Sequence, residues 1–127
     1  MFPETLTDVA TKLAEYCNSQ QESKALDTLY DVSCVSVEAL AMGEGGREAV
    51  GLDAIRGKHD WWYGAHDVHS TTAEGPFMAG EDKFALIFDM DVTNKESGQR
   101  MQMREVGLYT VTGGKIVREE FFYPPMG

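Results

Sequence analysis

Three glutamates stand on segments that read as β-strands, and they are the residues best suited to acid–base chemistry. Glu38 belongs to an alternating stretch, residues 33–41, while Glu105 and Glu119 flank a later Gly-Gly turn. Carboxylates that share an apolar cavity repel one another and lose hydration, so the pKa of at least one rises. Such a group acts as a general acid or base near neutral pH. We therefore take Glu38, Glu105 and Glu119 as candidate catalytic residues.

The same glutamates also fit a second interpretation, in which each faces solvent and pairs with an arginine or a lysine. An antiparallel sheet with one wet face carries polar residues at alternate positions along every strand. Perturbed carboxylates in clefts mark functional sites only in a statistical sense. Both interpretations remain open on the sequence.

The hairpin around residues 113–114 decides which neighbours Glu105 has. A three-residue loop over residues 112–114 would place Glu105 on the strand face of Glu119. A two-residue Gly-Gly turn would instead place it on the face of Glu120.

Residues 51–64 are expected to form a helix that carries two tryptophans. Ile55, His59 and Trp62 share one helix face. Successive side chains are about 100° apart, so Trp61 and Trp62 cannot both point inward, and one faces outward or caps the cavity mouth. Trp62 would give a flat wall for a ring-shaped ligand and His59 a neutral hydrogen-bonding group, although a core role for Trp62 is the simpler alternative. The candidate ligand-binding residues are His59, Trp62, Tyr30 and Phe121.

Metal, cofactor and covalent chemistry have little support in the sequence. His66 and His69 lie three apart on an expected strand, where alternation sends them to opposite faces. No phosphate-binding loop or nucleophile motif occurs, so we expect neither a metal nor a cofactor. Cys17 and Cys34 are expected to be reduced, packed thiols.

The composition predicts one domain spanning residues 1–127. The chain is 43% hydrophobic, which suffices for one sizeable core. Its 11 Lys and Arg against 21 Asp and Glu give a net charge of -10, which disfavours nucleic acid and anionic membranes as partners. The start of the chain lacks the pattern of a signal peptide, so we expect a soluble, cytoplasmic protein.

Hydrophobic periodicity predicts three helices followed by a run of long strands. An amphipathic helix covers residues 3–18, and a second pattern of Ala25, Leu26, Leu29 and Tyr30 predicts a short helix. A glycine-rich surface loop is expected over residues 42–51. Short connections favour an antiparallel meander, whose strands are residues 67–77, 83–93, 100–111 and 115–123.

This order of elements, with a G-x-x-A-I-R helix start at residues 51–56 and a terminal G-K-I-V strand at residues 114–117, resembles the NTF2-like superfamily. Within it the chain is most similar to SnoaL-like proteins. The resemblance implies an α+β fold, in which a cone-shaped, curved antiparallel sheet wraps around about three N-terminal helices. It also implies a pocket in the concave face and a homodimer formed through the sheet. The superfamily includes ketosteroid isomerases, polyketide cyclases and non-catalytic binding domains.

The resemblance to ketosteroid isomerases places Glu38 at the position of the general base. The tyrosine of their oxyanion site would fall at Leu13 or Ala14, which carry no hydroxyl. Their second acid falls near Gly107, with Glu105 on the same side of that strand.

The resemblance to SnoaL-type cyclases places Phe121 where they carry an aspartate, with Glu119 two residues before it. The family's inward positions favour the three-residue hairpin loop, which puts Glu105 and Glu119 together.

We therefore expect a pocket for a small, apolar carbonyl or cyclic organic compound. Glu38 as base, with Glu119 or Glu105 as acid partner, would support an isomerase, cyclase or hydrolase reaction without a cofactor. The alternatives are a non-catalytic ligand-binding or dimerisation domain, and a protein-interaction module that uses the acidic surface.

The other face of the sheet is expected to form the dimer. It is predicted to mix charged residues with exposed apolar ones, as interfaces do. These residues are Arg104, Arg118, Glu120, Phe122 and Met103.

Overall fold

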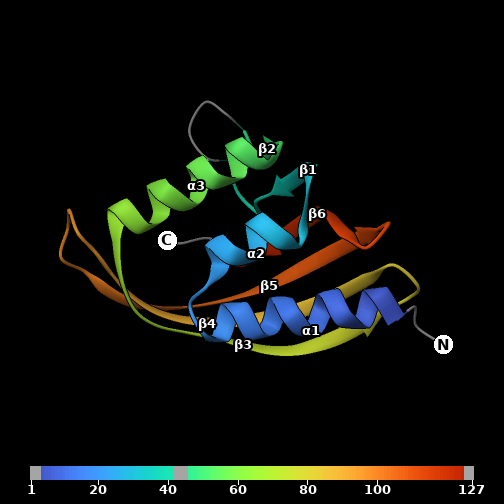
Figure 1. The fold of residues 1–127 in the computed structure, drawn as a ribbon. Helices are drawn as coiled ribbons and strands as arrows, with labels where there is room; N and C mark the ends of the chain where they lie inside the picture. Colours follow the sequence, from blue (N-terminus) through green and yellow to red (C-terminus); the bar gives the residue numbers. More distant parts are fainter. Residues whose placement is uncertain (1–3, 42–45, 125–127) are drawn as a thin grey trace.

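The computed structural model describes residues 4–41 and 46–124, and within them it contains three helices and six strands of an α+β fold (Figure 1). The order is α1 Glu4–Asn18, α2 Glu22–Thr28, β1 Tyr30–Val37, β2 Glu48–Val50, α3 Leu52–Ala65, β3 His66–Ala79, β4 Lys83–Asn94, β5 Arg100–Thr112 and β6 Lys115–Phe122. The three helices and the four long strands of the second half agree with the sequence prediction.

The six strands form one sheet in the order β2-β1-β6-β5-β4-β3. Strands β3 to β6 are the predicted antiparallel meander. Strand β1, however, pairs in parallel with β6, so the sheet is mixed rather than wholly antiparallel. A parallel pair needs a long connection between its strands, and here α3 and the meander supply that connection.

The helices cover one face of the curved sheet (Figure 1). Helix α1 packs along β3, α3 packs on β1, and α2 contacts both helices. The predicted apolar stripe of α1 is confirmed, because its members are buried in the core: Leu6, Val9, Ala10, Leu13 and Cys17. The core therefore lies between the helices and the concave face of the sheet.

Two local predictions before α3 are wrong. The second helix ends at Thr28, so Leu29 and Tyr30 lie outside it. The N–H of Ile116 donates to the carbonyl of Leu29, which aligns the following residues with β6 and begins β1. The predicted loop over residues 42–51 contains β2, which pairs with β1, while residues 42–45 lie outside the described part. A three-residue strand is too short to show a period in the sequence.

The β5–β6 hairpin differs from the predicted one in its loop length, but Glu105 and Glu119 still share one face of the sheet. Gly113 and Gly114 have φ of 59° and 78° and form a two-residue turn, so the predicted three-residue loop is wrong. A bulge at Val117 then shifts the register by one residue, which places Tyr109 opposite Glu119. Glu105 therefore shares the face of Glu119, as predicted, but the bulge rather than the loop causes it.

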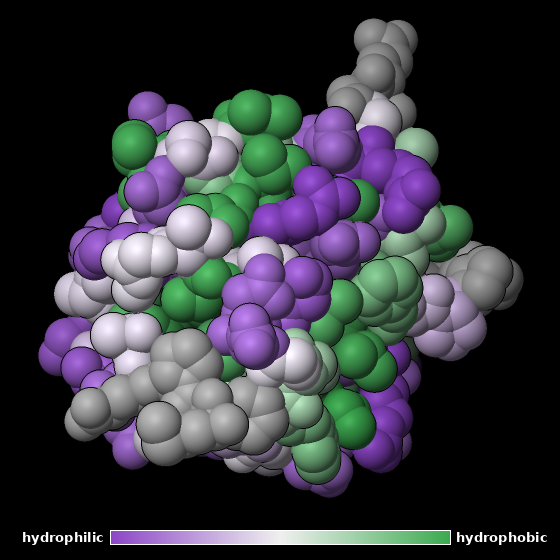
Figure 2. Space-filling model, turned by 90° about the vertical axis from the view of Figure 1, so that its right-hand side faces the viewer, coloured by the Kyte–Doolittle hydropathy of each residue, from purple (hydrophilic) through white to green (hydrophobic). Residues whose placement is uncertain are grey.

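The surface mixes polar and apolar side chains. On the face that Figure 2 shows, apolar residues form small patches separated by polar ones. Among the residues that the structure describes, no helix is long and apolar enough to cross a membrane.

A substitution at Gly107 tests how tightly the side chains on the concave face of the sheet are packed. A Cβ atom there would lie 3.0 Å from Cε2 of Phe88 and from the ring of Tyr109. We expect Gly107→Ala to lower the free energy of unfolding by about 1–3 kcal/mol in urea titrations, because those rings must move.

Gly57→Ala is the matched control, because Gly57 lies in α3 and its Cβ would meet nothing within 4 Å. It should raise the free energy of unfolding by about 0.5–1 kcal/mol. A Gly107→Ala protein that matches the native stability would contradict the packing described here.

Candidate functional site

A cavity of about 760 Å³ lies between the helices and the concave face of the sheet. Apolar and aromatic side chains dominate its walls, and a few polar groups reach into it. The structure brings all seven candidate site residues to this one cavity: Glu38, Glu105, Glu119, His59, Trp62, Tyr30 and Phe121.

Strand alternation explains how β5 and β6 reach the cavity. Met103, Glu105 and Tyr109 project inward from β5, and Glu119 and Phe121 project inward from β6. The sequence analysis predicted that Met103 lies on the outer face of the sheet, and this prediction is wrong. Met103 faces inward, because it lies two residues before Glu105 on the same strand.

Glu119 is the most deeply buried acid of the site, at 1% exposure. Its Oε1 accepts a short hydrogen bond from the hydroxyl of Tyr30. Among the described residues no partner reaches Oε2. Burial, together with the nearby charge of Glu119, raises the pKa of Tyr30 well above its ordinary value, so this tyrosine stays a hydrogen-bond donor.

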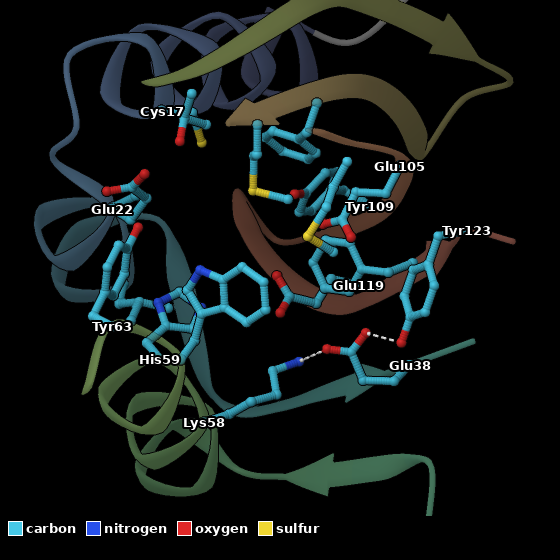
Figure 3. A pocket seen from close by; sticks show the side chains of 18 of the residues that line it. Cys17, Glu22, Glu38, Lys58, His59, Tyr63, Glu105, Tyr109, Glu119 and Tyr123 are labelled. Carbon is cyan, nitrogen blue, oxygen red and sulfur yellow. Dashed lines mark hydrogen bonds and ion pairs between the residues drawn. The ribbon is translucent and has the colours of Figure 1, made fainter. Parts of the chain in front are cut away.

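Glu38 takes part in a second charged group, which Figure 3 shows joined by dashed lines. Lys58 Nζ lies 3.0 Å from Glu38 Oε1, and the Tyr123 hydroxyl donates to Glu38 Oε2 at 3.3 Å. Lys58 also donates to the hydroxyl of Ser36, and its Nζ lies 5.1 Å from the centre of the Phe121 ring. The side chains of Lys58 and Glu38 are only 10% and 15% exposed, so this ion pair is held largely out of water.

Glu105 has the ionisation best matched to proton transfer. Burial in the cavity raises its pKa from 4.5 to about 7, and the charge of Glu38 adds to the rise. The Lys58 ammonium acts in the opposite direction. At neutral pH this carboxyl is therefore present in both protonation states, and it can donate or accept a proton.

The aromatic helix face agrees with the predicted arrangement. Trp61 is 63% exposed and lies at the cavity rim, so it is the outward tryptophan. Trp62 lines the cavity and stacks on His66, with ring centres 3.9 Å apart. Burial lowers the pKa of His59, so its imidazole is neutral at pH 7.

His66 and His69 do not form a joint site. His66 is buried against Trp62, whereas His69 is exposed and bonds to Thr93. Within the described ranges no group of three His, Cys, Asp or Glu side chains is arranged to hold a metal ion.

Sequence reasoning missed seven polar residues that line the cavity: Cys17, Glu22, Lys58, Tyr63, Thr71, Tyr109 and Tyr123. Lys58 follows Ile55 by three residues and precedes Trp62 by four, which is the spacing of one helix face. Tyr109 follows Glu105 by four strand positions, so alternation also places it inward. These signals were present in the sequence.

Glu105 should make the stability of the protein fall as the pH rises. Its folded pKa of about 7 exceeds the ordinary 4.5, so the carboxyl favours folding below pH 4.5 and this contribution is lost on the way to pH 7. As the pH rises through this window, the free energy of unfolding of Glu105→Gln should increase relative to that of the native protein by about 1 kcal/mol for each pH unit.

Urea titrations between pH 4.5 and 7 measure this difference. The control is Glu120→Gln, whose carboxylate pairs with Arg118 on the opposite face of β6. A Glu105→Gln difference that does not change with pH would show that this carboxyl ionises normally.

Comparison with solved structures finds proteins that share the fold of this chain. A protein from Mesorhizobium loti, provisionally assigned as a SnoaL-like polyketide cyclase with the bracketed description carbohydrate phosphatase, is 37% identical with a TM-score of 0.87. The alignment covers 93% of this chain and 98% of that protein.

Two more distant structures share the fold alone. A Δ5-3-ketosteroid isomerase from Mycobacterium sp. is 19% identical with a TM-score of 0.67, over 94% of this chain and 93% of that one. TerC, co-crystallised with polyporic acid, is 14% identical with a TM-score of 0.72, over 96% and 92%.

No curated protein matches the chain at a significant level. The model of the SnoaL-like domain, however, matches residues 4–123, which is nearly the whole sequence. The chain therefore belongs to the SnoaL-like domain family.

Proposed function

We propose that this protein binds a small, largely apolar carbonyl or cyclic compound and transforms it by acid–base chemistry without a cofactor. One observation carries the proposal: the carboxyl of Glu105, with a pKa of about 7, lines an apolar cavity beside two further glutamates. A group whose pKa lies near the working pH transfers protons most effectively. The reaction class is an isomerisation, cyclisation or hydrolysis.

The proposed step is a proton transfer at a carbon next to a carbonyl group. The carboxylate of Glu105 takes the proton, the C–H electron pair moves into the carbonyl to form an enolate, and the protonated Glu105 returns the proton to carbon. Burial raises the pKa of Glu105, the charge of the Glu38 carboxylate adds to the rise, and Lys58 holds Glu38 in place. The Lys58 ammonium also favours negative charge that develops on the substrate oxygen.

Glu119 has a different proposed role, because Tyr30 already occupies one of its oxygens. The pair forms the polar end of the cavity and orients the ligand. Trp62, Phe121 and neutral His59 line the apolar body of the site. The proposal thus assigns proton transfer to the Glu38–Glu105 side and positioning to the Glu119–Tyr30 side.

A non-catalytic ligand-binding domain is the second candidate. Phe121 stands where related cyclases carry an aspartate, and it presents an aromatic ring to the cavity. Leu13 lines the cavity near the position where ketosteroid isomerases carry a tyrosine. Both substitutions favour binding over chemistry at those two positions.

We also propose that two copies of the chain associate through the outer face of the sheet. Val106 and Phe122 are paired across β5 and β6 and are 37% and 48% exposed. Arg104, Arg118 and Glu120 lie nearby on the same strands. Apolar side chains mixed with arginine are typical of interfaces.

We further propose a cytoplasmic location, which the free thiols of Cys17 and Cys34 support.

Hydrogen–deuterium exchange tests the proposed chemistry without knowledge of the natural substrate. We expect the protein to accelerate exchange of the protons next to the carbonyl in a panel of cyclic ketones in D₂O, followed by NMR. The rate should rise with pH to a plateau above pH 7, because Glu105 must be ionised to accept the proton.

Glu105→Gln should reduce this exchange by about 100-fold or more, and Glu38→Gln should move the midpoint of its pH profile to lower pH. Glu120→Gln is the matched control and should leave the rate unchanged. Full exchange activity in Glu105→Gln would refute the assignment. Tight ketone binding without exchange in the native protein would favour the binding domain.

The dimer proposal is tested by the mass of the protein in solution. The native chain should sediment as a dimer, and Val106→Asp together with Phe122→Asp should give a folded monomer, because each charge would be buried in the contact. Trp61→Ser serves as a control for a loss of exposed apolar surface elsewhere. A native protein that remains monomeric at high concentration would contradict this proposal.

A further inference from the structure

We infer that the ligand of this cavity carries a protonated amine, which donates a hydrogen bond to Oε2 of Glu119. The inference rests on the proposed function, because it names the polar group of the ligand that the same cavity would hold.

The buried oxygen of Glu119 is the first observation. The side chain is 1% exposed and lines the cavity, and Figure 3 shows its carboxylate directed into the open space. Oε1 accepts from Tyr30, while Oε2 has no hydrogen-bond partner within residues 4–41 and 46–124. A buried carboxylate oxygen that lacks a donor is unfavourable. The cavity is the side from which a ligand can supply that donor.

The partner of Oε1 indicates that Glu119 acts as an acceptor. The Tyr30 hydroxyl stays protonated in this buried position, and a phenol that donates to a carboxylate makes a charge-assisted hydrogen bond. The Tyr30 hydroxyl therefore occupies Oε1, and Oε2 is the acceptor that remains without a partner among the described residues. The free oxygen is then suited to an N–H or O–H donor and unsuited to a carbonyl oxygen.

The charge balance of the cavity favours a cation among the possible donors. Four acidic side chains of the described residues line it, namely Glu22, Glu38, Glu105 and Glu119, and Glu105 is only partly ionised near pH 7. Among the residues that the structure describes, Lys58 is the one lysine that lines the cavity. It lies 3.0 Å from Glu38, so it offsets that carboxylate first. His59 is neutral at pH 7. The cavity therefore keeps a negative potential, which concentrates positively charged ligands.

The aromatic walls complete the chemistry that a cationic amine requires. Several aromatic rings line the cavity together with the polar groups, among them those of Tyr30, Trp62, Phe88, Tyr109 and Phe121. The face of an aromatic ring attracts an ammonium group, most strongly where water is excluded. Lys58 already uses this attraction over Phe121. An amine with an apolar cyclic body would satisfy Glu119 and the aromatic walls together.

Three probes that share one adamantane cage test the inference. They carry an amine, a hydroxyl or a ketone at the same carbon, and calorimetry near neutral pH measures their binding to the whole chain. We expect the amine to bind about tenfold more tightly than the other two, because only it combines a donor with a charge.

Glu119→Gln preserves the shape of the side chain and an acceptor for Tyr30, and it removes the charge. It should weaken amine binding about tenfold and change the binding of the alcohol and ketone by less than about threefold. Glu120→Gln, one residue along β6 on the opposite face, should leave all three affinities unchanged.

If Glu119→Gln fails to fold, the affinities of the three probes for the native protein decide the outcome. An alcohol or ketone that binds as tightly as the amine overturns the inference, and so does an amine preference that survives in folded Glu119→Gln. If the adamantane ketone binds best and the ketones of the exchange panel exchange their protons, the proposed function stands and the inference fails. If the amine binds best and no ketone exchanges, the inference stands and the proposed chemistry fails.

Discussion

The interior depends on one buried polar contact, the hydrogen bond between Tyr30 and Glu119. It joins the first residue of β1 to the middle of β6, the two strands that pair in parallel. A carboxylate at this depth loses its hydration and must find compensation from neighbours. Tyr30 compensates one oxygen and leaves the other directed into the cavity. Oε2 is the position that the proposed ligand would fill.

The influence of that charge extends to the other polar residues of the cavity. Burial raises the pKa of Cys17 to about 12, and the charges of Glu22 and Glu119 reinforce the shift. Burial and Glu119 likewise hold the pKa of Tyr109 well above its ordinary value. These groups stay protonated, so they cannot serve as bases at neutral pH. Among the cavity's acids, Glu105 is the group whose pKa is raised to the neutral range.

The sequence predicted the elements well because their periods are long and regular. Glu105 shares the inward face with Glu119 because of a bulge at Val117, which no local pattern reveals. The two-residue turn and the bulge together place Glu105 on the face of Glu119, as the predicted three-residue loop would have done. The parallel pairing of β1 with β6 is a long-range contact that hydrophobic periodicity does not report. The Lys58–Glu38 pair joins α3 to the residue after β1, so its partners were visible in the sequence but their meeting was not. Family resemblance identified the fold, and the chemistry depends on these particular contacts.

The central claim is that Glu105, Glu38 and Glu119 share a cavity with too little water for all three to ionise normally. Site-resolved carboxyl NMR of the glutamates, followed through a pH titration, tests it most directly. The account predicts that the signal of Glu105, assigned with Glu105→Gln, titrates with a midpoint near 7. A midpoint near the ordinary value of 4.5 would contradict it, because that carboxyl would then be exposed to bulk water.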